Sequence, residues 1–227
     1  MKDVKIVATI GPSSFSFETI KKMKENGLNI ARINTKWGDE KQWESMIQLL
    51  HRLGIEIMID VKSLSVMTWV NSQKINYLAV SYAQSKLQIK KIRGMMKDKT
   101  VRIISKIETK AGLENIDNLI EVSDGIMVAR GDLSRNIPFE KVPYYKKLII
   151  DKCKAKKVFV IVATEMLLSM INSKVPTNAE VEDVFSAVVE GGSAVMLSEE
   201  SAIGKYPTLS VKTMRKIVCN AEKYLGS

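Results

Sequence analysis

The sequence predicts a single parallel (β/α)8 barrel, and three observations lead to that fold class. Eight short runs rich in Val and Ile recur along the 227 residues, and amphipathic helical patterns fill most of the gaps between them. The runs are almost continuously apolar, as is typical of parallel strands that are covered on both faces. The chain length also lies within the range of about 200–250 residues that is common for one barrel. We therefore expect one domain over residues 1–227.

The expected strands are short apolar runs, and the expected helices place apolar residues at the 3.6-residue spacing. The third βα unit is shortened, because residues 62–76 leave room for a loop and one or two helical turns. The expected strands are Lys5–Ile10, Asn29–Asn34, Glu56–Val61, Tyr77–Tyr82, Arg102–Ile107, Gly125–Ala129, Val158–Ala163 and Ala194–Leu197. The clearest helical patterns are Phe17–Glu25, Gln42–Arg52, Lys86–Lys97, Leu113–Glu121 and Leu209–Tyr224.

Composition excludes several classes of protein. The net charge is +10, but the lysines lie largely in helical stretches and the aromatic residues are scattered, so we expect no nucleic-acid partner. The charge excess instead favours a small anionic substrate. No apolar run approaches the length of a membrane span, and no signal peptide precedes the first strand. Together with two cysteines read as reduced thiols, Cys153 and Cys219, this predicts a cytoplasmic protein without a membrane partner.

Two carboxylates, Glu108 and Asp132, each follow an expected strand, with one helical stretch between them. Successive parallel strands joined by a crossover helix lie side by side, so both acids should project toward the same space. Two oxygen ligands suit Mg²⁺ or Mn²⁺ and leave coordination positions for oxygens of a substrate. The alternative is that both side chains are simply solvated.

The other residues at the strand ends are strongly polar and of both charges. Such a mixed cluster suits an anion held beside a metal ion. Gly131 and Asp132 begin an expected short helix whose amide groups would form a carboxylate-binding nest, although Asp132 can equally serve as a helix cap. The polar set includes Arg32, Asn34, Lys36, Asp60, Lys62, Ser81, Lys106, Thr164, Ser198, Glu199 and Glu200.

Seven segments of the chain resemble the pyruvate kinase family. The resemblance runs in order along nearly the whole chain and implies a TIM barrel of the phosphoenolpyruvate/pyruvate type. It is interrupted between Val61 and Tyr77. The segments are Lys5–Ser14, Asn29–Asn34, Ile104–Glu108, Val122–Leu133, Ala163–Leu167, Pro176–Glu180 and Val195–Ser201.

The resemblance also implies a role for each matching residue. Glu108 and Asp132 would be the divalent-metal ligands, and Lys106 the cation that stabilises the enolate and bridging phosphate. Arg32 would hold phosphate. Thr164, with Gly131 and Asp132, would bind the substrate carboxylate, and Thr164 would also lie on a proton path with Ser198 and Glu200. An enolate needs positive charge at its oxygen and a proton donor on the opposite face, which fits these roles.

Several departures from the family pattern restrict the expected chemistry. The resemblance covers the barrel domain alone: the segment Ser63–Asn76 stands where the family inserts its lid domain, and we expect the C-terminal domain to be absent. The glutamate and phosphate-binding arginine of the third-strand motif are missing. Trp37 replaces a nucleotide-side histidine, and Lys36 replaces a serine ligand of K⁺. We hypothesise that the Lys36 ammonium occupies the monovalent-cation site between Asn34 and Asp60 and replaces K⁺; the alternative is a surface lysine.

Three functions follow from this pattern. The first is a pyruvate kinase-like enzyme that binds phosphoenolpyruvate or pyruvate with Mg²⁺, although efficient phosphoryl transfer to ADP is not expected without the lid. The second is nucleotide-independent enolate chemistry on a small keto acid, of the oxaloacetate decarboxylase or aldolase type. The third is a non-catalytic barrel that binds a partner protein.

We also expect apolar surface around residues 66–70, in the shortened third unit. Exposed Val66, Met67, Trp69 and Val70 would favour a homo-oligomer or a partner protein that covers the open site. The alternative is that this segment packs over the barrel wall.

Overall fold

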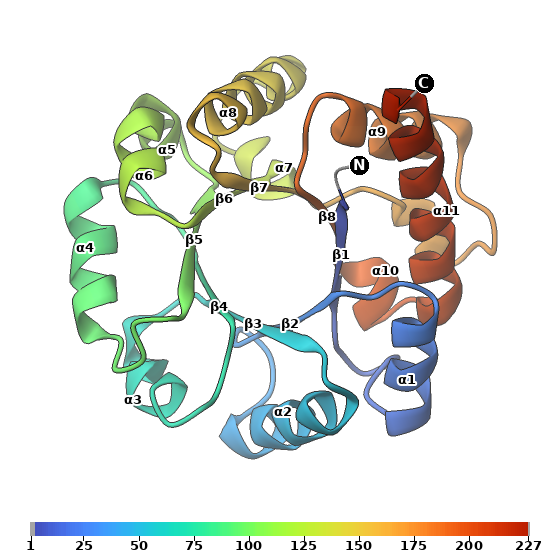
Figure 1. The fold of residues 1–227 in the computed structure, drawn as a ribbon, viewed down its shortest axis with the longest axis horizontal. Coiled ribbons are helices and arrows are strands. Elements are labelled where there is room, and N and C mark those ends of the chain that lie inside the picture. The colour runs from blue at the N-terminus through green and yellow to red at the C-terminus, as the bar shows by residue number, and fades with distance from the viewer. Residues whose placement is uncertain (1–2, 227) are drawn as a thin grey trace.

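The computed structural model describes residues 3–226, which form a closed barrel of eight parallel strands in chain order (Figure 1). All eight strands lie where the sequence predicts them, with ends that differ by no more than two residues. The strands are β1 (Lys5–Thr9), β2 (Ile30–Asn34), β3 (Glu56–Val61), β4 (Tyr77–Val80), β5 (Arg102–Ile107), β6 (Gly125–Ala129), β7 (Phe159–Ala163) and β8 (Ala194–Leu197).

The helices form a ring outside the strands (Figure 1). None of those in residues 3–226 has the length and apolar character needed to span a bilayer. They are α1 (Phe17–Glu25), α2 (Glu40–Leu53), α3 (Met67–Val70), α4 (Lys86–Met95), α5 (Lys110–Glu114), α6 (Ile116–Val122), α7 (Arg130–Leu133), α8 (Val142–Lys156), α9 (Asn178–Val189), α10 (Glu199–Ala202) and α11 (Pro207–Gly226). Three single 3₁₀ turns, η1 (Leu64–Val66), η2 (Phe139–Lys141) and η3 (Leu168–Ile171), complete the elements.

One expected helix is in fact two. The sequence predicts a continuous helix over Leu113–Glu121, but α5 ends and α6 begins at Asn115, whose backbone leaves the helical region (φ −101°, ψ 15°). The Asn115 side-chain amide donates to the carbonyl of Ala111 at 3.2 Å. This local hydrogen bond competes with the helical pattern, as asparagine side chains commonly do. The 3.6-residue spacing continues through the break, so periodicity alone does not reveal it.

The third βα unit is short, as predicted, and contains η1 and α3 alone. Its apolar residues do not form an exposed patch, so that expectation is wrong. Met67, Trp69 and Val70 are buried, and Val66 packs against the core. The Trp69 ring lies 5.0 Å from the ring of Trp43 on α2. Burial of these side chains stabilises the connection by removing apolar area from water, and it holds the segment against the barrel wall.

Two apolar clusters form the core, one inside the barrel and one between the strands and the helices. At the amino end of the barrel, Lys5 pairs with Glu56, and the buried Tyr77 hydroxyl also donates to Glu56. Contacts at that end of a barrel usually serve stability rather than catalysis. At the opposite end the register pairs Thr9 with Arg32 and Asn34 with Asp60, which gathers polar residues at the carboxyl ends of three neighbouring strands.

A capping box fixes the start of α9. The Thr177 hydroxyl accepts from the Glu180 amide, and the Glu180 carboxylate accepts from the Thr177 amide at 2.7 Å. Glu180 also accepts from the amide and hydroxyl of Ser169, at 2.6 and 2.5 Å. Partial burial opposes the charged form of Glu180, but the hydrogen bonds from Ser169 and Thr177 outweigh it and lower its pKa. The carboxylate thus joins α9 to the turn after β7.

Glu180→Ala should lower the free energy of unfolding by about 0.5–2 kcal/mol, the usual cost of losing a helix cap. Because the pKa of Glu180 is lowered in the folded state, its contribution is present at neutral pH and is lost as the carboxylate protonates below about pH 4. Urea denaturation at pH 7 and at acid pH measures both effects. Glu182→Ala, an exposed acid on the same helix, is the matched control and should change stability by less than about 0.5 kcal/mol; equal losses in the two variants would contradict the prediction.

Candidate active site

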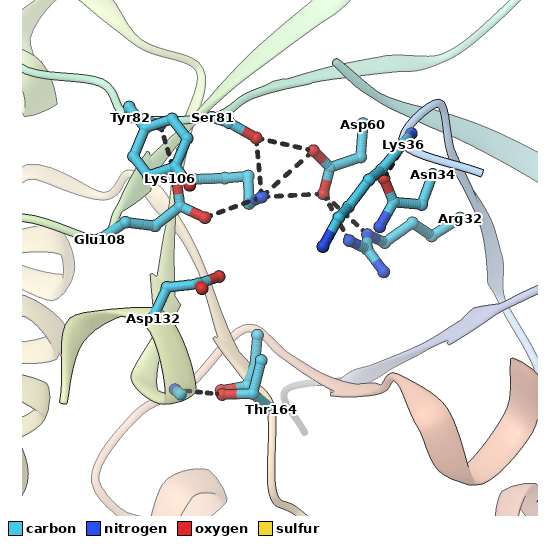
Figure 2. A network of polar contacts seen from close by, with 12 residues as sticks. Arg32, Asn34, Lys36, Asp60, Ser81, Tyr82, Lys106, Glu108, Asp132 and Thr164 are labelled. Carbon is cyan, nitrogen blue, oxygen red and sulfur yellow. Dashed lines mark hydrogen bonds and ion pairs between the residues drawn. The ribbon is translucent and has the colours of Figure 1, made fainter. Parts of the chain in front are cut away.

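A cavity of about 900 Å³ opens at the carboxyl ends of the strands, which is where barrels of this class place their sites. It is lined by every predicted site residue except Asp60, which lies directly beneath it as the partner of Arg32 and Lys106. The charged residues come from β2, β3, β5 and the turn after β6, and they converge on one space (Figure 2).

Asp60 is the central acceptor of the site. It is buried, and its Oδ2 accepts from Arg32 Nε at 2.8 Å and pairs with Lys106 Nζ at 3.1 Å. Its Oδ1 accepts from the Ser81 hydroxyl at 3.2 Å. Burial by itself would raise the pKa of Asp60, but the charges of Arg32 and Lys106 outweigh burial and hold the pKa below its ordinary value. Asp60 is therefore an anion that fixes two cations.

Arg32 is held from two sides. Besides Asp60, it donates from Nη1 to the Thr9 hydroxyl at 2.8 Å, and that hydroxyl donates to the carbonyl of Leu197 on β8. The guanidinium is almost fully buried by protein yet lines the cavity. Its plane is thus fixed before any ligand binds, which favours recognition of a phosphate or carboxylate.

Lys106 and Glu108 lie two residues apart at the end of β5 and face the same space. Lys106 Nζ is 3.0 Å from Glu108 Oε1 and 3.0 Å from the Ser81 hydroxyl. Glu108 Oε2 accepts from the Tyr82 amide at 2.6 Å. Burial raises the pKa of Glu108 even though the Lys106 ammonium and the Tyr82 amide both favour its charged form. The carboxylate therefore has a fixed orientation, and a nearby cation stabilises its charged form.

The Asp132 carboxylate faces the same space as that of Glu108 (Figure 2), and both residues line the cavity. Its side chain is 41% exposed, and it makes a long ion pair of 3.5 Å with Arg135. The structure shows no side-chain cap on α7, so the capping role is not observed. Across residues 3–226 no group of three or more His, Cys, Asp or Glu is arranged to hold a metal. Two hard carboxylates on one cavity nonetheless fit a cation such as Mg²⁺ that takes its other ligands from substrate and water.

Thr164 and Gly131 contact each other at the edge of the cavity. The Gly131 amide donates to Thr164 Oγ1 at 2.7 Å, and this hydroxyl donates to the Ala163 carbonyl at 2.6 Å. The predicted nest is therefore partly occupied by Thr164 itself. Thr164 and Glu165 both have left-handed backbones, with φ of 70° and 55°, a conformation that costs of order 1–3 kcal/mol for each non-glycine residue.

Arg130 holds this strained turn in place. Its guanidinium donates to the carbonyls of Ala163 and Thr164, at 3.4 and 2.5 Å, and pairs with Asp183 of α9 at 2.5 Å. Arg130 is buried, so these charge-assisted bonds act in a low-dielectric environment where they are strong. The position of the Thr164 hydroxyl consequently depends on Arg130.

Ser198 and Glu200 follow β8 and both line the cavity. Glu200 is fully buried, and it accepts from the amides of Leu167 at 3.0 Å and Ser198 at 2.7 Å. Burial raises its pKa, although these amides oppose the rise. The buried Ser198 hydroxyl has no hydrogen-bond partner among the described residues. Such a hydroxyl is available to a ligand or to water.

Lys36 does not contact Asp60 in the manner hypothesised. Its side chain is exposed, and its ammonium lies 4.9 Å from the centre of the Trp37 ring. Asn34 Oδ1 accepts from the Lys36 amide at 3.1 Å, so it is the backbone that joins these two residues. Asp60 takes its positive partners from Arg32 and Lys106 instead. Lys36 is an exposed residue that lines the cavity, and its hypothesised role at a monovalent-cation site stays a prediction.

Four further residues position the site, and the sequence analysis assigned a role to none of them. Thr9 orients Arg32, Ser81 joins Lys106 to Asp60, the Tyr82 amide holds Glu108, and Arg130 holds Thr164. Ser81 and Arg130 stand at strand ends, which is a usable signal. The contribution of Tyr82 comes from its amide and its left-handed backbone (φ 52°), which residue type does not reveal.

Comparisons with known proteins agree with this geometry. A family model for the pyruvate kinase barrel domain matches residues 1–62 and 58–211. A pyruvate kinase of Lactococcus lactis is 44% identical over 154 residues, covering 66% of this chain and 31% of that protein. One of Dictyostelium discoideum is 38% identical over 205 residues, covering 88% of this chain and 39% of that protein. One of Thermoplasma acidophilum is 30% identical over 310 positions, covering 94% of this chain and 57% of that protein.

The chain thus spans between about a third and somewhat more than half of the length of these relatives. The Thermoplasma alignment is longer than the 227 residues of this chain, so that relative carries inserted segments. The two parts of the family match meet at the end of β3, where the resemblance implies a missing lid. On the strength of these matches and of the closed eight-stranded barrel, the chain belongs to the pyruvate kinase family and contains its barrel domain.

Proposed function

We propose that this chain binds phosphoenolpyruvate, pyruvate or a related small keto acid together with Mg²⁺ or Mn²⁺, and stabilises the enolate of pyruvate. One observation carries the proposal: Lys106, Glu108 and Asp132 face the same cavity (Figure 2). Two carboxylates and one ammonium around an open space are the groups that a metal ion and an enolate require. Membership of the pyruvate kinase family supports the same chemistry.

Glu108 and Asp132 would hold the divalent cation. When bound, the ion supplies positive charge to oxygens of the substrate. A cation at Glu108 would also compete for Oε1, the oxygen that now lies 3.0 Å from Lys106. The Lys106 ammonium, still anchored by Asp60 and Ser81, would then be free to face the substrate. Arg32, fixed by Asp60 and Thr9, provides a second cation for phosphate.

Thr164, Ser198 and Glu200 would move a proton on the other side of the substrate. The raised pKa of Glu200, which follows from its burial, lets this carboxyl hold a proton at higher pH than an exposed glutamate. The Ser198 hydroxyl, which has no hydrogen-bond partner in residues 3–226, supports a role in passing that proton toward the cavity. Thr164 is held at the cavity by the hydrogen bond that Arg130 donates to its carbonyl.

Glu108→Gln should weaken Mg²⁺-dependent binding of oxalate or pyruvate by about tenfold or more, because it removes a ligand charge while keeping the side-chain shape. Isothermal titration calorimetry in the presence and absence of Mg²⁺ measures the effect. Glu114→Gln, an exposed glutamate of α5, is the matched control and should bind as the wild type does. Unchanged binding by Glu108→Gln would contradict the assignment of this residue to the metal.

A second reaction class is favoured by a specific observation. The connection Ser63–Asn76 packs against the barrel wall, with Met67, Trp69 and Val70 buried, so no part of it covers the cavity. Phosphoryl transfer depends on exclusion of water and on positioning of a nucleotide. Decarboxylation of oxaloacetate, aldol chemistry or proton exchange of pyruvate needs enolate stabilisation alone. A barrel that binds a partner without catalysis is a weaker candidate, since the metal, cation and proton-relay residues are all present.

Two assays separate the reaction classes. Pyruvate formation from phosphoenolpyruvate that requires ADP would identify a kinase, whereas Mg²⁺-dependent loss of CO₂ from oxaloacetate without nucleotide would identify a lyase. We expect the second activity to exceed the first for this chain alone, because nothing in its third unit shields the site. Lys106→Met should abolish whichever activity is found. Absence of both activities, with Mg²⁺-dependent oxalate binding intact, would favour the non-catalytic alternative.

We further propose that Lys36 removes the need for K⁺. For this the ammonium must leave the Trp37 ring and turn toward Asn34, where it would supply the charge of the monovalent ion. Replacement of K⁺ by tetramethylammonium should therefore leave Mg²⁺-dependent oxalate affinity unchanged, within about twofold, whereas Lys36→Ser should make it depend on K⁺. A clear K⁺ dependence of the wild-type chain, measured by the same calorimetry, would refute this role.

A further inference from the structure

Arg135 lines the cavity beside Asp132, one of the two proposed metal ligands. Its Nη1 lies 3.5 Å from Asp132 Oδ1, and the two side chains are 80% and 41% exposed. An ion pair that is this long and this exposed contributes little to the stability of a fold. The positive charge of Arg135 is therefore available to a ligand without loss to the barrel.

The backbone that carries Arg135 is held in place, although its side chain is exposed. Leu133 is fully buried and anchors the segment. The Arg135 amide donates to the Asp132 carbonyl at 3.3 Å, and the Asn136 side-chain amide donates to the same carbonyl at 2.9 Å. The guanidinium thus starts from a fixed point next to Asp132, and rotation about its own side-chain bonds is enough to change its partner.

Four other cations of residues 3–226 line the cavity, and each is engaged elsewhere. Two are held by the buried Asp60 carboxylate, and two lie over aromatic rings. They are Arg32 and Lys106, which pair with Asp60, and Lys36 and Lys62, whose ammonium groups lie 4.9 and 5.7 Å from the ring centres of Trp37 and Tyr82. Arg135 is thus the lining cation that pairs with Asp132.

Arg135 would have to give up Asp132 when a divalent cation binds there. Two positive groups beside one carboxylate repel each other, so the more mobile group, the guanidinium, leaves. Acid oxygens of the substrate bind to the same ion. Oxygens held at about 2.1 Å from one Mg²⁺ in octahedral geometry lie about 3 Å apart, so these oxygens are close to Asp132 and within reach of Arg135. The planar fork of arginine suits a carboxylate.

We infer that Arg135 exchanges partners when the ligand binds: its guanidinium leaves Asp132 and donates to a carboxylate oxygen of the metal-bound acid. The inference rests on the proposed function, because Asp132 must hold the metal. Arg135 then has two effects of opposite sign. It opposes binding of the metal ion alone, since both compete for Asp132, and it favours binding of the acid once the metal is present.

Arg135→Gln in the full chain tests both effects. Titration with Mn²⁺ alone, followed by the electron paramagnetic resonance signal of the free ion, should show an affinity that rises about two- to fivefold, because the competing ion pair is lost. Calorimetric titration with oxalate at saturating Mn²⁺ should show an affinity that falls about three- to tenfold, because a charge-assisted hydrogen bond is lost.

Lys147→Gln is the matched control. It also removes one positive charge from an exposed ion pair within a single helical segment, here with Asp151 on α8, but it lies outside the cavity. Because solvent and salt screen such a distant charge, neither affinity should change by more than about 1.5-fold. Equal changes in the two variants would show a general effect of net charge and would overturn the inference.

The remaining outcomes separate the inference from the proposed function. A rise in Mn²⁺ affinity with unchanged oxalate affinity shows that Arg135 only neutralises Asp132, and overturns the inference. A loss of both affinities shows that Arg135 orients Asp132 for the metal, and overturns it too. Failure of the wild-type chain to bind Mn²⁺ and oxalate refutes the proposed function, and the inference falls with it. Thermal unfolding of Arg135→Gln should match that of the wild type, because the side chain is 80% exposed.

Discussion

The buried Asp60 carboxylate is the interaction on which the rest of the site depends. A carboxylate removed from water must be compensated, since an unpaired buried charge costs several kcal/mol. Arg32 and Lys106 provide that compensation, and Ser81 satisfies a remaining lone pair. The pairing also acts in the other direction, because Asp60 holds two cations at fixed positions beneath the cavity. Positive charge is therefore in place before an anion arrives, and binding need not reorganise it.

The barrel supplies the register that this arrangement requires. Thr9 pairs with Arg32 and Asn34 with Asp60 on neighbouring strands, so the first three strands present polar residues at adjacent carboxyl ends. The turn of Thr164 is positioned differently, by a strained backbone that other contacts hold in place. The left-handed residues Thr164 and Glu165 are maintained by Arg130, whose own charge is compensated by Asp183. Two arginine–aspartate pairs thus hold the site in place. Arg32 with Asp60 fixes the cations, and Arg130 with Asp183 fixes the turn of Thr164.

Sequence reasoning succeeds where one physical rule dominates and fails where local contacts compete. The strands were predictable because parallel strands covered on both faces must be apolar throughout, and the polar strand-end residues followed from the barrel. The break between α5 and α6 at Asn115 could not be predicted, since one side-chain hydrogen bond overrides a helical pattern that continues past it. Residues 66–70 were predicted to be exposed because their partner, Trp43 on α2, is distant in sequence. The Tyr82 amide and the orientation of Lys36 depend on backbone angles and loop packing, which residue types do not specify.

The short connection after β3 links the fold to the chemistry. Because residues 63–76 are held to the wall by buried Met67, Trp69 and Val70, none of them covers the cavity. Water weakens electrostatic interactions, so Lys106, Glu108 and Asp132 act at full strength when a ligand displaces that water.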